Sequence, residues 1–147
     1  MCPLKILVVG DDFTPFNLFE EHLRAMPSAR DANIVGFDLA PDSPSPANLP
    51  DISEYFGDPT LIAEKIVDVD VLVVTFAPVT REVIDSAKHL KLIACARGGP
   101  VNVNVDYATK KRIPVVLAPG RNAEAVADYT MGLIICLCRS ILKADKY

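Results

Sequence analysis

The fold of this chain can be read outward from residues 91–130, "KLIACARGGPVNVNVDYATKKRIPVVLAPGRNAEAVADYT". Two runs within it, 92–96 and 115–118, consist only of Val, Leu, Ile, Ala and Cys. Such unalternated runs are typical of parallel strands that are covered on both faces. Each run leads into a glycine-bearing loop, at 97–100 and 119–122. The stretch therefore predicts two buried strands whose loops lie at the same edge of a sheet.

Three further apolar runs come earlier in the chain, at 6–10, 34–40 and 71–77. The segments predicted to be helical lie between or after these runs: Pro15–Met26, Pro59–Val67, 81–90, 105–112, and Asn122 to Leu142. Repeated alternation of strand and helix favours right-handed parallel βαβ units. The sequence therefore predicts an α/β, flavodoxin-like three-layer fold, with a five-stranded parallel sheet in the order 2-1-3-4-5 and a long C-terminal helix.

Local signals define the ends of several elements. Thr80, Asn104 and Asn122 each precede a helical segment and are predicted to be N-caps. Pro59 suits the first position of a helix. The stretch from 41 to 57 is predicted to be an irregular surface connection because of its prolines. These are Pro41, Pro44, Pro46 and Pro50.

Composition narrows the class of protein. Half of the 147 residues are hydrophobic, 23% are charged and the net charge is −4. This predicts a single globular unit and argues against nucleic-acid binding, which needs a basic face. The apolar runs are too short to span a membrane, and the start "MCPLKILVVG" lacks the pattern of a signal peptide. His22 and His89 lie in charged helical settings and are expected at the surface.

The four cysteines point to a reducing compartment. Cys95 lies in an apolar strand, and Cys136 and Cys138 lie in an apolar helix, two positions apart. That spacing directs the two side chains apart, which suits neither a disulfide nor a metal clip. All four cysteines, Cys2 included, are predicted to be free thiols, and Cys95, Cys136 and Cys138 are predicted to be buried. Free thiols indicate a cytoplasmic protein. No metal site is expected.

Chemistry is expected in the loops at the carboxyl edge of the sheet. In "ARGGPVN", glycines without Cβ would let the backbone approach a ligand and direct N–H groups at an anion. Arg97 could add charge, and the Asn102 amide can both donate and accept. The alternative is a plain tight turn formed by Gly98, Gly99 and Pro100. Spacing alone leaves both interpretations open.

Two other functions have weaker support. The dinucleotide-binding fingerprint G-x-G-x-x-G and the phosphate-binding P-loop G-x-x-x-x-G-K-[ST] are both absent from the sequence. Asp11 and Asp12 could hold Mg²⁺ in a phosphoacceptor receiver, but that chemistry needs an Asp after the third strand and a Lys after the fifth. Those places read 75–77 "TFA" and 118–120 "APG". Asp11 and Asp12 are therefore predicted to form turns and caps.

The two glycine loops together strongly resemble the D-isomer-specific 2-hydroxyacid dehydrogenases, the family that includes 3-phosphoglycerate dehydrogenase. The matching motifs are Arg97-Gly98-Gly99, Asn102-Val103-Asn104, Pro119-Gly120-Arg121-Asn122 and Val126-Ala127-Asp128. The resemblance implies that residues 1–120 form the flavodoxin-like substrate-binding, or catalytic, domain. Residues 121–147 would be the crossover helix into a Rossmann domain that binds NAD and lies outside these residues. It also implies that the catalytic Arg, Glu and His belong to that second domain, so no catalytic or cofactor-binding residue is expected here.

The same resemblance implies which residues bind the substrate. Backbone N–H groups around Phe76, Ala77, Gly98 and Gly99 would hold its carboxylate, with Asn102 at the floor of the cleft. Phe76 and Ala77 stand where many relatives have Arg-Ser-like residues, which disfavours a phosphorylated substrate. Asp128 and Tyr129 replace a common Glu-His pair.

The expected function is the substrate-binding part of an NAD-dependent oxidoreductase acting on the CH-OH group of a 2-hydroxy acid. The chain alone is expected to be inactive and not to bind NAD. It is expected to form a homodimer through the apolar segment 129–142, because such a helix is normally buried. The alternative is a stand-alone small-anion, carboxylate-binding or receiver-like module without catalysis.

Overall fold

The computed structural model describes residues 3–40, 42 and 49–145. Its strands are β1 (Lys5–Asp11), β2 (Asn33–Leu39), β3 (Val71–Val74), β4 (Leu92–Cys95) and β5 (Val115–Leu117). Its helices are α1 (Phe16–Ala25), α2 (Pro59–Lys65), α3 (Arg81–Ser86), α4 (Val105–Lys110), α5 (Ala123–Cys138) and α6 (Ile141–Ala144). The expectations for Cys2, Pro41, Pro44, Pro46 and the last two positions of 121–147 fall outside the described residues.

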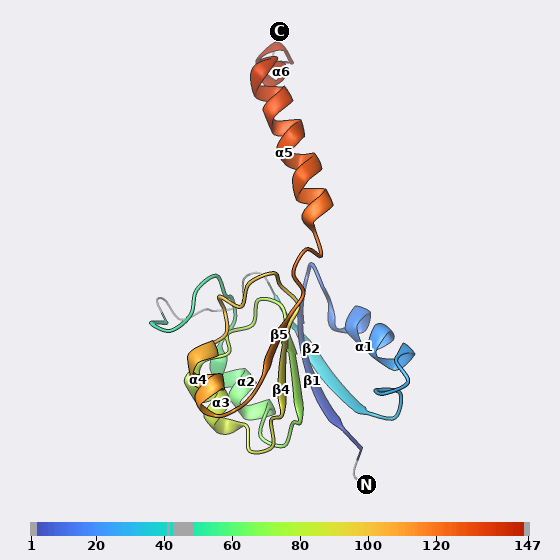
Figure 1. Ribbon diagram of the computed structural model, residues 1–147, viewed down its shortest axis with the longest axis vertical. Helices are drawn as coiled ribbons and strands as arrows, with labels where there is room; N and C mark the ends of the chain where they lie inside the picture. The colour runs from blue at the N-terminus through green and yellow to red at the C-terminus, as the bar shows by residue number, and fades with distance from the viewer. Residues whose placement is uncertain (1–2, 41, 43–48, 146–147) are drawn as a thin grey trace.

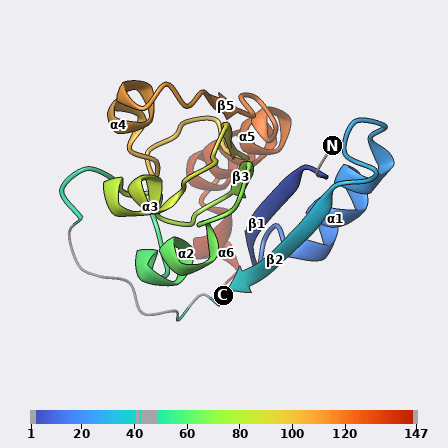
Figure 2. The ribbon, with the colours of Figure 1, turned by 90° about the horizontal axis from the view of Figure 1, so that it is seen from below.

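All the strand pairs are parallel, and the sheet order is β2-β1-β3-β4-β5, as predicted. Figures 1 and 2 show α1 on one face of the sheet and α2, α3 and α4 on the other. The larger core lies on the side of α2–α4 and includes Leu7, Ile62, Ile66, Leu72 and Ile93. The smaller core, on the side of α1, includes Ile6, Val8, Ile34 and Val73. The three-layer α/β prediction is confirmed.

Local signals set several helix ends correctly. The side chain of Thr80 accepts a hydrogen bond from Val83 N–H at 3.4 Å, and that of Asn104 accepts one from Tyr107 N–H at 2.9 Å. Pro59 opens α2, as predicted. The predicted helix 81–90 was too long, since α3 ends at Ser86. The strand predicted at 71–77 was also too long, because its last three residues leave the ladder and form a loop.

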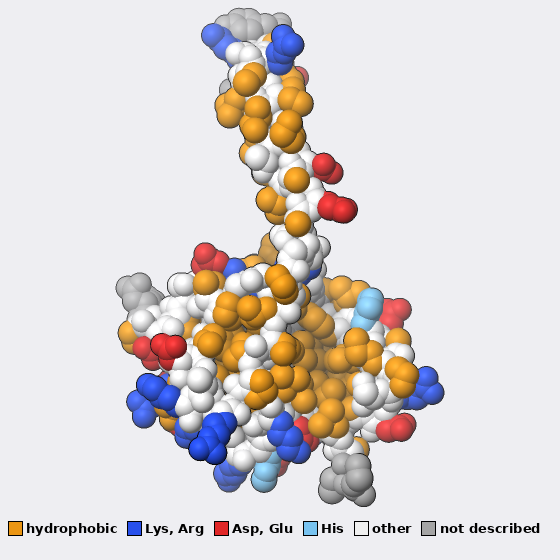
Figure 3. All heavy atoms as spheres, in the orientation of Figure 1, with side chains coloured by type: hydrophobic (Ala, Val, Ile, Leu, Met, Phe, Trp, Pro, Cys, Tyr) orange, Lys and Arg blue, Asp and Glu red, His pale blue; other side chains and the backbone are white. Residues whose placement is uncertain are grey.

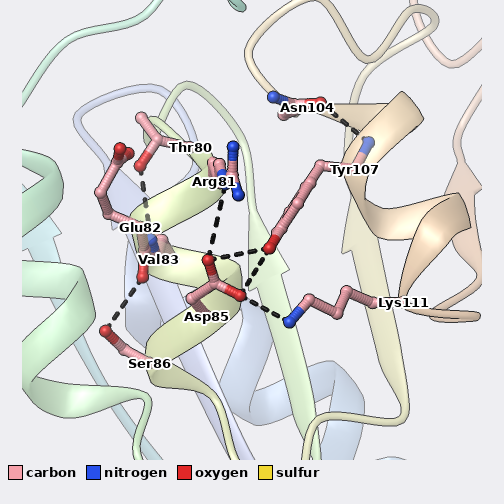
Figure 4. A network of polar contacts seen from close by, with 9 residues as sticks. All are labelled: Thr80, Arg81, Glu82, Val83, Asp85, Ser86, Asn104, Tyr107 and Lys111. Atoms are coloured by element: carbon pink, nitrogen blue, oxygen red, sulfur yellow. Dashed lines mark hydrogen bonds and ion pairs between the residues drawn. The ribbon is translucent and has the colours of Figure 1, made fainter.

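A polar cluster holds α3 against α4 (Figure 4). The hydroxyl of Tyr107 donates to Asp85 at 2.7 Å, and Lys111 Nζ lies 2.6 Å from the same carboxylate. The hydrogen bond from Lys111, and then the one from Tyr107, lowers the pKa of Asp85. Asn104 caps the helix that carries Tyr107, so the cluster helps to hold the segment before α4 in place.

Asp70 ties together the starts of three strands. Its carboxylate accepts a hydrogen bond from Lys5 N–H at 2.9 Å and lies 2.8 Å from Lys91 Nζ. Its backbone bonds to the same two residues, at 2.9 and 2.7 Å. The hydrogen bond from Lys91, followed by that from Lys5, lowers the pKa of Asp70 below its ordinary value of 3.8.

We expect Asp70→Asn to lower the free energy of unfolding by about 1–2 kcal/mol at neutral pH, because the side chain loses a charge-assisted hydrogen bond. A carboxyl whose pKa is lowered by folding stabilises the protein above its ordinary pKa, and this contribution is lost as the pH falls through the folded value. The difference between variant and parent should therefore shrink below about pH 4. Urea unfolding across this pH range is the measurement. Exposed Asp68 is the control, and an equal loss with Asp68→Asn would contradict this assignment.

The C-terminal helix departs most from expectation. Figure 1 shows α5 projecting away from the sheet, and none of its residues is buried. Cys95 is buried, as predicted, but Cys136 is only half-buried and Cys138 is exposed, because α5 packs on neither face of the sheet. Asn122 precedes α5 but makes no side-chain capping bond. The helix predicted to reach Leu142 breaks at Ser140, which has a left-handed φ of 51° and starts the short α6.

The surface positions predicted for two histidines were correct. His22 and His89 are both exposed. Within the described ranges, the helices are all too short or too polar to cross a membrane.

Candidate functional site

The loops after β3 and β4 are joined to each other at the carboxyl edge of the sheet. Val79 and Val103 form a parallel bridge. Val79 N–H donates to the carbonyl of Asn102, and Asn104 N–H donates to that of Val79, both at 2.9 Å. The bridge extends the contact between these chain segments beyond the regular strands. It brings the predicted site residues 76–77 and 97–102 into one region.

Asn102 is the buried link between these loops. Its side-chain amide donates to the carbonyls of Thr75 at 3.1 Å and Ala77 at 2.8 Å. Its side-chain oxygen lies 3.7 Å from the thiol of Cys95, which can donate to it. Burial raises the pKa of Cys95, although the backbone N–H of Arg97 and the charge of that residue oppose the rise, so the thiol keeps its proton at neutral pH. Asn102 thus positions the loops, a role that its sequence position did not indicate.

Four backbone N–H groups in these loops are unpaired among the described residues, and one of them belongs to Ala77, which is only 1% exposed. Those of Phe76, Ala77, Gly98 and Gly99 have no hydrogen-bond partner within the part of the chain that the structure describes. They come from the two loops that Asn102 holds together. Free N–H groups from adjacent loops are the usual donors for a small anion.

The backbone conformation of Gly98 and Gly99 does not explain why these positions hold glycine. Gly98 and Gly99 are outside the left-handed region, where Gly57 and Gly120 lie. A Cβ added to Gly98 would meet its nearest atom at 4.0 Å, and one added to Gly99 would meet nothing within 4 Å. A tight turn or close packing inside the chain therefore does not require glycine at either position. Approach of an external group to the backbone remains a physical reason for it.

Aromatic rings and one cation surround Phe76. Its ring stacks on Phe56 with a centroid distance of 5.3 Å and lies 6.4 Å from the ring of Phe13. The guanidinium of Arg97 lies over the Phe76 ring at 4.4 Å and pairs with Glu54. Sequence reasoning missed Phe13, Glu54 and Phe56, because residues so distant in sequence carry no shared pattern.

Asp11 forms a turn at this edge, as predicted. One of its carboxylate oxygens accepts the N–H groups of Phe13 and Thr14, each at 2.9 Å. The hydroxyl of Thr14 lies 2.8 Å from that of Thr75, where a receiver domain would need a carboxylate. The other oxygen of Asp11 is buried without a partner among the described residues. No three His, Cys, Asp or Glu side chains in those residues come together as metal ligands.

Two of the cavities among the described residues are of a size that could hold a small ligand. One of about 460 Å³ is lined by both acidic and basic side chains, including Asp51, Arg81, Asp106 and Lys110. Its mixed charges give no preference for an anion. A second, of about 280 Å³, is mostly apolar and lies against α1, with Thr14, Phe19, His22, Ala96 and Arg121 among its lining residues. Neither is lined by the four residues with free N–H groups. The size of a cavity is therefore a poorer guide here than unpaired donors.

Comparison of the sequence with models of known protein families identifies the family of this chain. The sequence model of the D-isomer specific 2-hydroxyacid dehydrogenase catalytic domain matches residues 51–136, more than half of the chain. The chain belongs to this family. The resemblance seen in the two glycine loops is thereby confirmed, and the matched region contains all the predicted site residues.

Proteins named as dehydrogenases or reductases are similar to about half of the chain. D-3-phosphoglycerate dehydrogenase of Methanocaldococcus jannaschii is 46% identical over 84 residues, which are 56% of this chain and 16% of that protein. Hydroxypyruvate reductase of Thermotoga maritima is 44% identical over 80 residues, 54% of this chain and 26% of that protein. The chain therefore matches only about a quarter or less of the length of these relatives.

Solved structures share the fold of this chain. The PH0520 protein of Pyrococcus horikoshii is 28% identical with a TM-score of 0.65, and covers all of this chain with 37% of its own. The TT0316 protein of Thermus thermophilus has a TM-score of 0.70 at 24% identity, covering 98% of this chain and 40% of its own. The NAD⁺-bound 3-phosphoglycerate dehydrogenase of Entamoeba histolytica has a TM-score of 0.66 at 20% identity, over 92% and 39%. At the lower identities the likeness concerns the fold alone.

Proposed function

We propose that this chain is the substrate-binding part of an NAD-dependent D-2-hydroxyacid dehydrogenase, which oxidises the CH-OH group of a small 2-hydroxy acid. The observation that carries the proposal is the set of free N–H groups at Phe76, Ala77, Gly98 and Gly99. Membership of the family supports it. The proposed enzyme would transfer a hydride between the acid and NAD, and these residues would hold the acid in place.

The proposed ligand contact is to the substrate carboxylate. The N–H groups of the two loops would donate to its oxygens, and the guanidinium of Arg97, which is paired with Glu54, would lie beside them. Asn102 would act by holding the carbonyls of Thr75 and Ala77, which fixes the direction of the loops. Many relatives have Arg-Ser-like residues where this chain has Phe76 and Ala77. Since Phe76 carries no charge that could bind a phosphate group, we propose a substrate without a phosphate group.

The residues of this chain do not themselves fit NAD. G-x-G-x-x-G is absent from the sequence. The free N–H groups lie in the loops after β3 and β4, whereas a dinucleotide phosphate binds at the N-terminus of a helix. We propose that residues 1–120 are the substrate-binding domain, that 121–147 are the connection to an NAD-binding domain, and that the chain alone is inactive.

We also propose that the chain forms a homodimer in the cytoplasm. The apolar surface of α5 supports the dimer, since the helix has no buried residue. The buried free thiol of Cys95 is consistent with a reducing compartment. We propose neither a nucleic-acid nor a membrane partner.

NMR titration of the isotope-labelled chain with pyruvate tests the proposed site. Shift changes are expected at 76–79 and 98–102. Gly99→Ala should leave the unfolding free energy nearly unchanged, because the added Cβ meets no atom within 4 Å. The same Cβ would occupy space beside the free N–H groups and weaken pyruvate binding by roughly tenfold, or about 1.4 kcal/mol.

The control is Gly132→Ala, which also adds a Cβ in open space but lies on α5, far along the chain from the loops. It should not change pyruvate binding. In the same series NADH should produce no shift changes. Pyruvate shifts confined to Asp11 and Asp12, or equal affinity for pyruvate and inorganic phosphate, would instead favour the stand-alone anion-binding or receiver-like module.

A further inference from the structure

Arg97 is a cation held in a fixed position beside the free N–H groups. It directly precedes Gly98, and its guanidinium lies 4.4 Å from the centroid of the Phe76 ring. Only 15% of its side chain is exposed. Stacking on an aromatic ring restricts the guanidinium in a way that a surface lysine would not be restricted. The positive charge of Arg97 is therefore held in a fixed position.

Glu54 neutralises this cation. Its carboxylate lies 2.6 Å from Nη2 of Arg97, and its backbone carbonyl accepts from Nη1 at 3.1 Å. The side chain of Glu54 is 66% exposed, so its carboxylate faces solvent on one side while it pairs with Arg97 on the other. Its φ of 49° is left-handed, which is unfavourable for a residue with a side chain.

The segment that carries Glu54 is fastened to both loops of the candidate site. Ser53 N–H donates to the carbonyl of Val101 at 2.7 Å, and Phe56 N–H donates to that of Phe76 at 3.3 Å. Glu54 lies between these two bonds, and the ring of Phe56 stacks on that of Phe76. Its unfavourable backbone conformation is therefore imposed by surrounding contacts. This places its carboxylate on Arg97 in the free protein.

We propose that Glu54 is a charge-selecting residue, which makes the site at 76–77 and 98–99 favour singly charged acids over doubly charged ones. This inference rests on the proposed function, because it concerns the ligand of that same site. The carboxylate of a small 2-oxo or 2-hydroxy acid would use the backbone N–H groups. A second anionic group on the ligand would meet an arginine that is already paired and an exposed carboxylate of the same sign.

The charges account for this preference. A monoanion binds at the N–H groups, and its attraction to Arg97 is largely cancelled by Glu54. A dianion carries a further charge that must be placed near Glu54, and repulsion between like charges weakens its binding. Removing the charge of Glu54 would leave Arg97 free to pair with the second group of the dianion.

The test compares pyruvate, a monoanion, with 2-oxoglutarate, a dianion, by NMR titration of the intact chain. Glu54→Gln keeps the size of the side chain and removes its charge. We expect it to strengthen 2-oxoglutarate binding roughly tenfold relative to pyruvate. Glu64→Gln is the matched control, because it removes the same charge from an exposed position on α2. It should leave the ratio of the two affinities unchanged.

A double variant tests whether Arg97 causes the gain, whatever the effect of the substitution on the segment that carries Glu54. Adding Arg97→Gln to Glu54→Gln should abolish the gain for 2-oxoglutarate, since the freed cation is its cause. If Glu54→Gln leaves the ratio unchanged while pyruvate still shifts 76–79 and 98–102, this inference is wrong and the proposed function stands. If neither acid shifts these loops in the parent chain, the proposed function fails and this inference fails with it.

Discussion

Replacing Asn102 with alanine is expected to lower the free energy of unfolding by about 2–4 kcal/mol. The side chain is fully buried and donates to the carbonyls of Thr75 and Ala77. Alanine would leave both acceptors without that donor and would leave a small void. Urea unfolding followed by circular dichroism measures the loss. We also expect the backbone signals of 76–77 and 98–99 to shift together in NMR spectra, because the link between the two loops is gone.

Asn104→Ala is the matched control for this change. Asn104 is the same type of residue, two positions further on, but it caps α4 and its loss should cost only about 1 kcal/mol. It should also leave the signals of the loop after β3 nearly unchanged. Equal losses in the two variants would show that Asn102 does not hold the loops together in the way its hydrogen bonds suggest.

Self-association through α5 is the second large effect that we expect. None of the helix is buried, and Leu137 is 76% exposed. Figure 3 shows apolar side chains covering much of the projecting helix. Burying such a leucine or isoleucine is worth about 1.5–3 kcal/mol. A symmetric dimer would bury several of them on each chain. The intact chain is therefore expected to sediment as a dimer at micromolar concentrations.

Point changes in the intact chain test this expectation directly. Leu133 and Leu137 lie one turn apart on one face of α5. Changing both to Glu should produce a monomer with unchanged stability of the sheet domain, because α5 has no buried residue. Changing Ala123 and Ala127 to Glu adds the same charges on small residues at the acidic end of the helix, and should leave the dimer intact. A parent chain that sediments as a clean monomer would refute the proposed dimer.

The family and the sheet were predictable because their signals are local. A buried parallel strand must avoid polar side chains on both faces, so the five apolar runs could be recognised without knowing their neighbours. The caps at Thr80 and Asn104 bond to N–H groups only three residues away. The glycine loops at 97–100 and 119–122 were specific enough to indicate the family that the comparison with known sequences shows.

The course of the last helix could be predicted only in part. Its apolar composition indicated a helix that needs burial, and this led to the wrong expectation that Cys136 and Cys138 are buried. Periodicity describes which sides of a helix are apolar. It does not say whether the domain has a surface to receive them. The break at Ser140 was missed because its backbone conformation is left-handed, which serine seldom adopts.

The sequence by itself determined the order of strands and helices, their buried faces and the loops that could carry chemistry. Only the tertiary structure decided how those loops are held. Asn102 reaches carbonyls 25 and 27 residues earlier, and Arg97 reaches Glu54 across 43 residues. Such contacts depend on where each loop lies after the sheet has formed, since one polar residue in a loop looks like any other until its partner is placed beside it. Burial turned Asn102 into a structural link, and the left-handed turn at Glu54 placed a carboxylate on the cation beside the site.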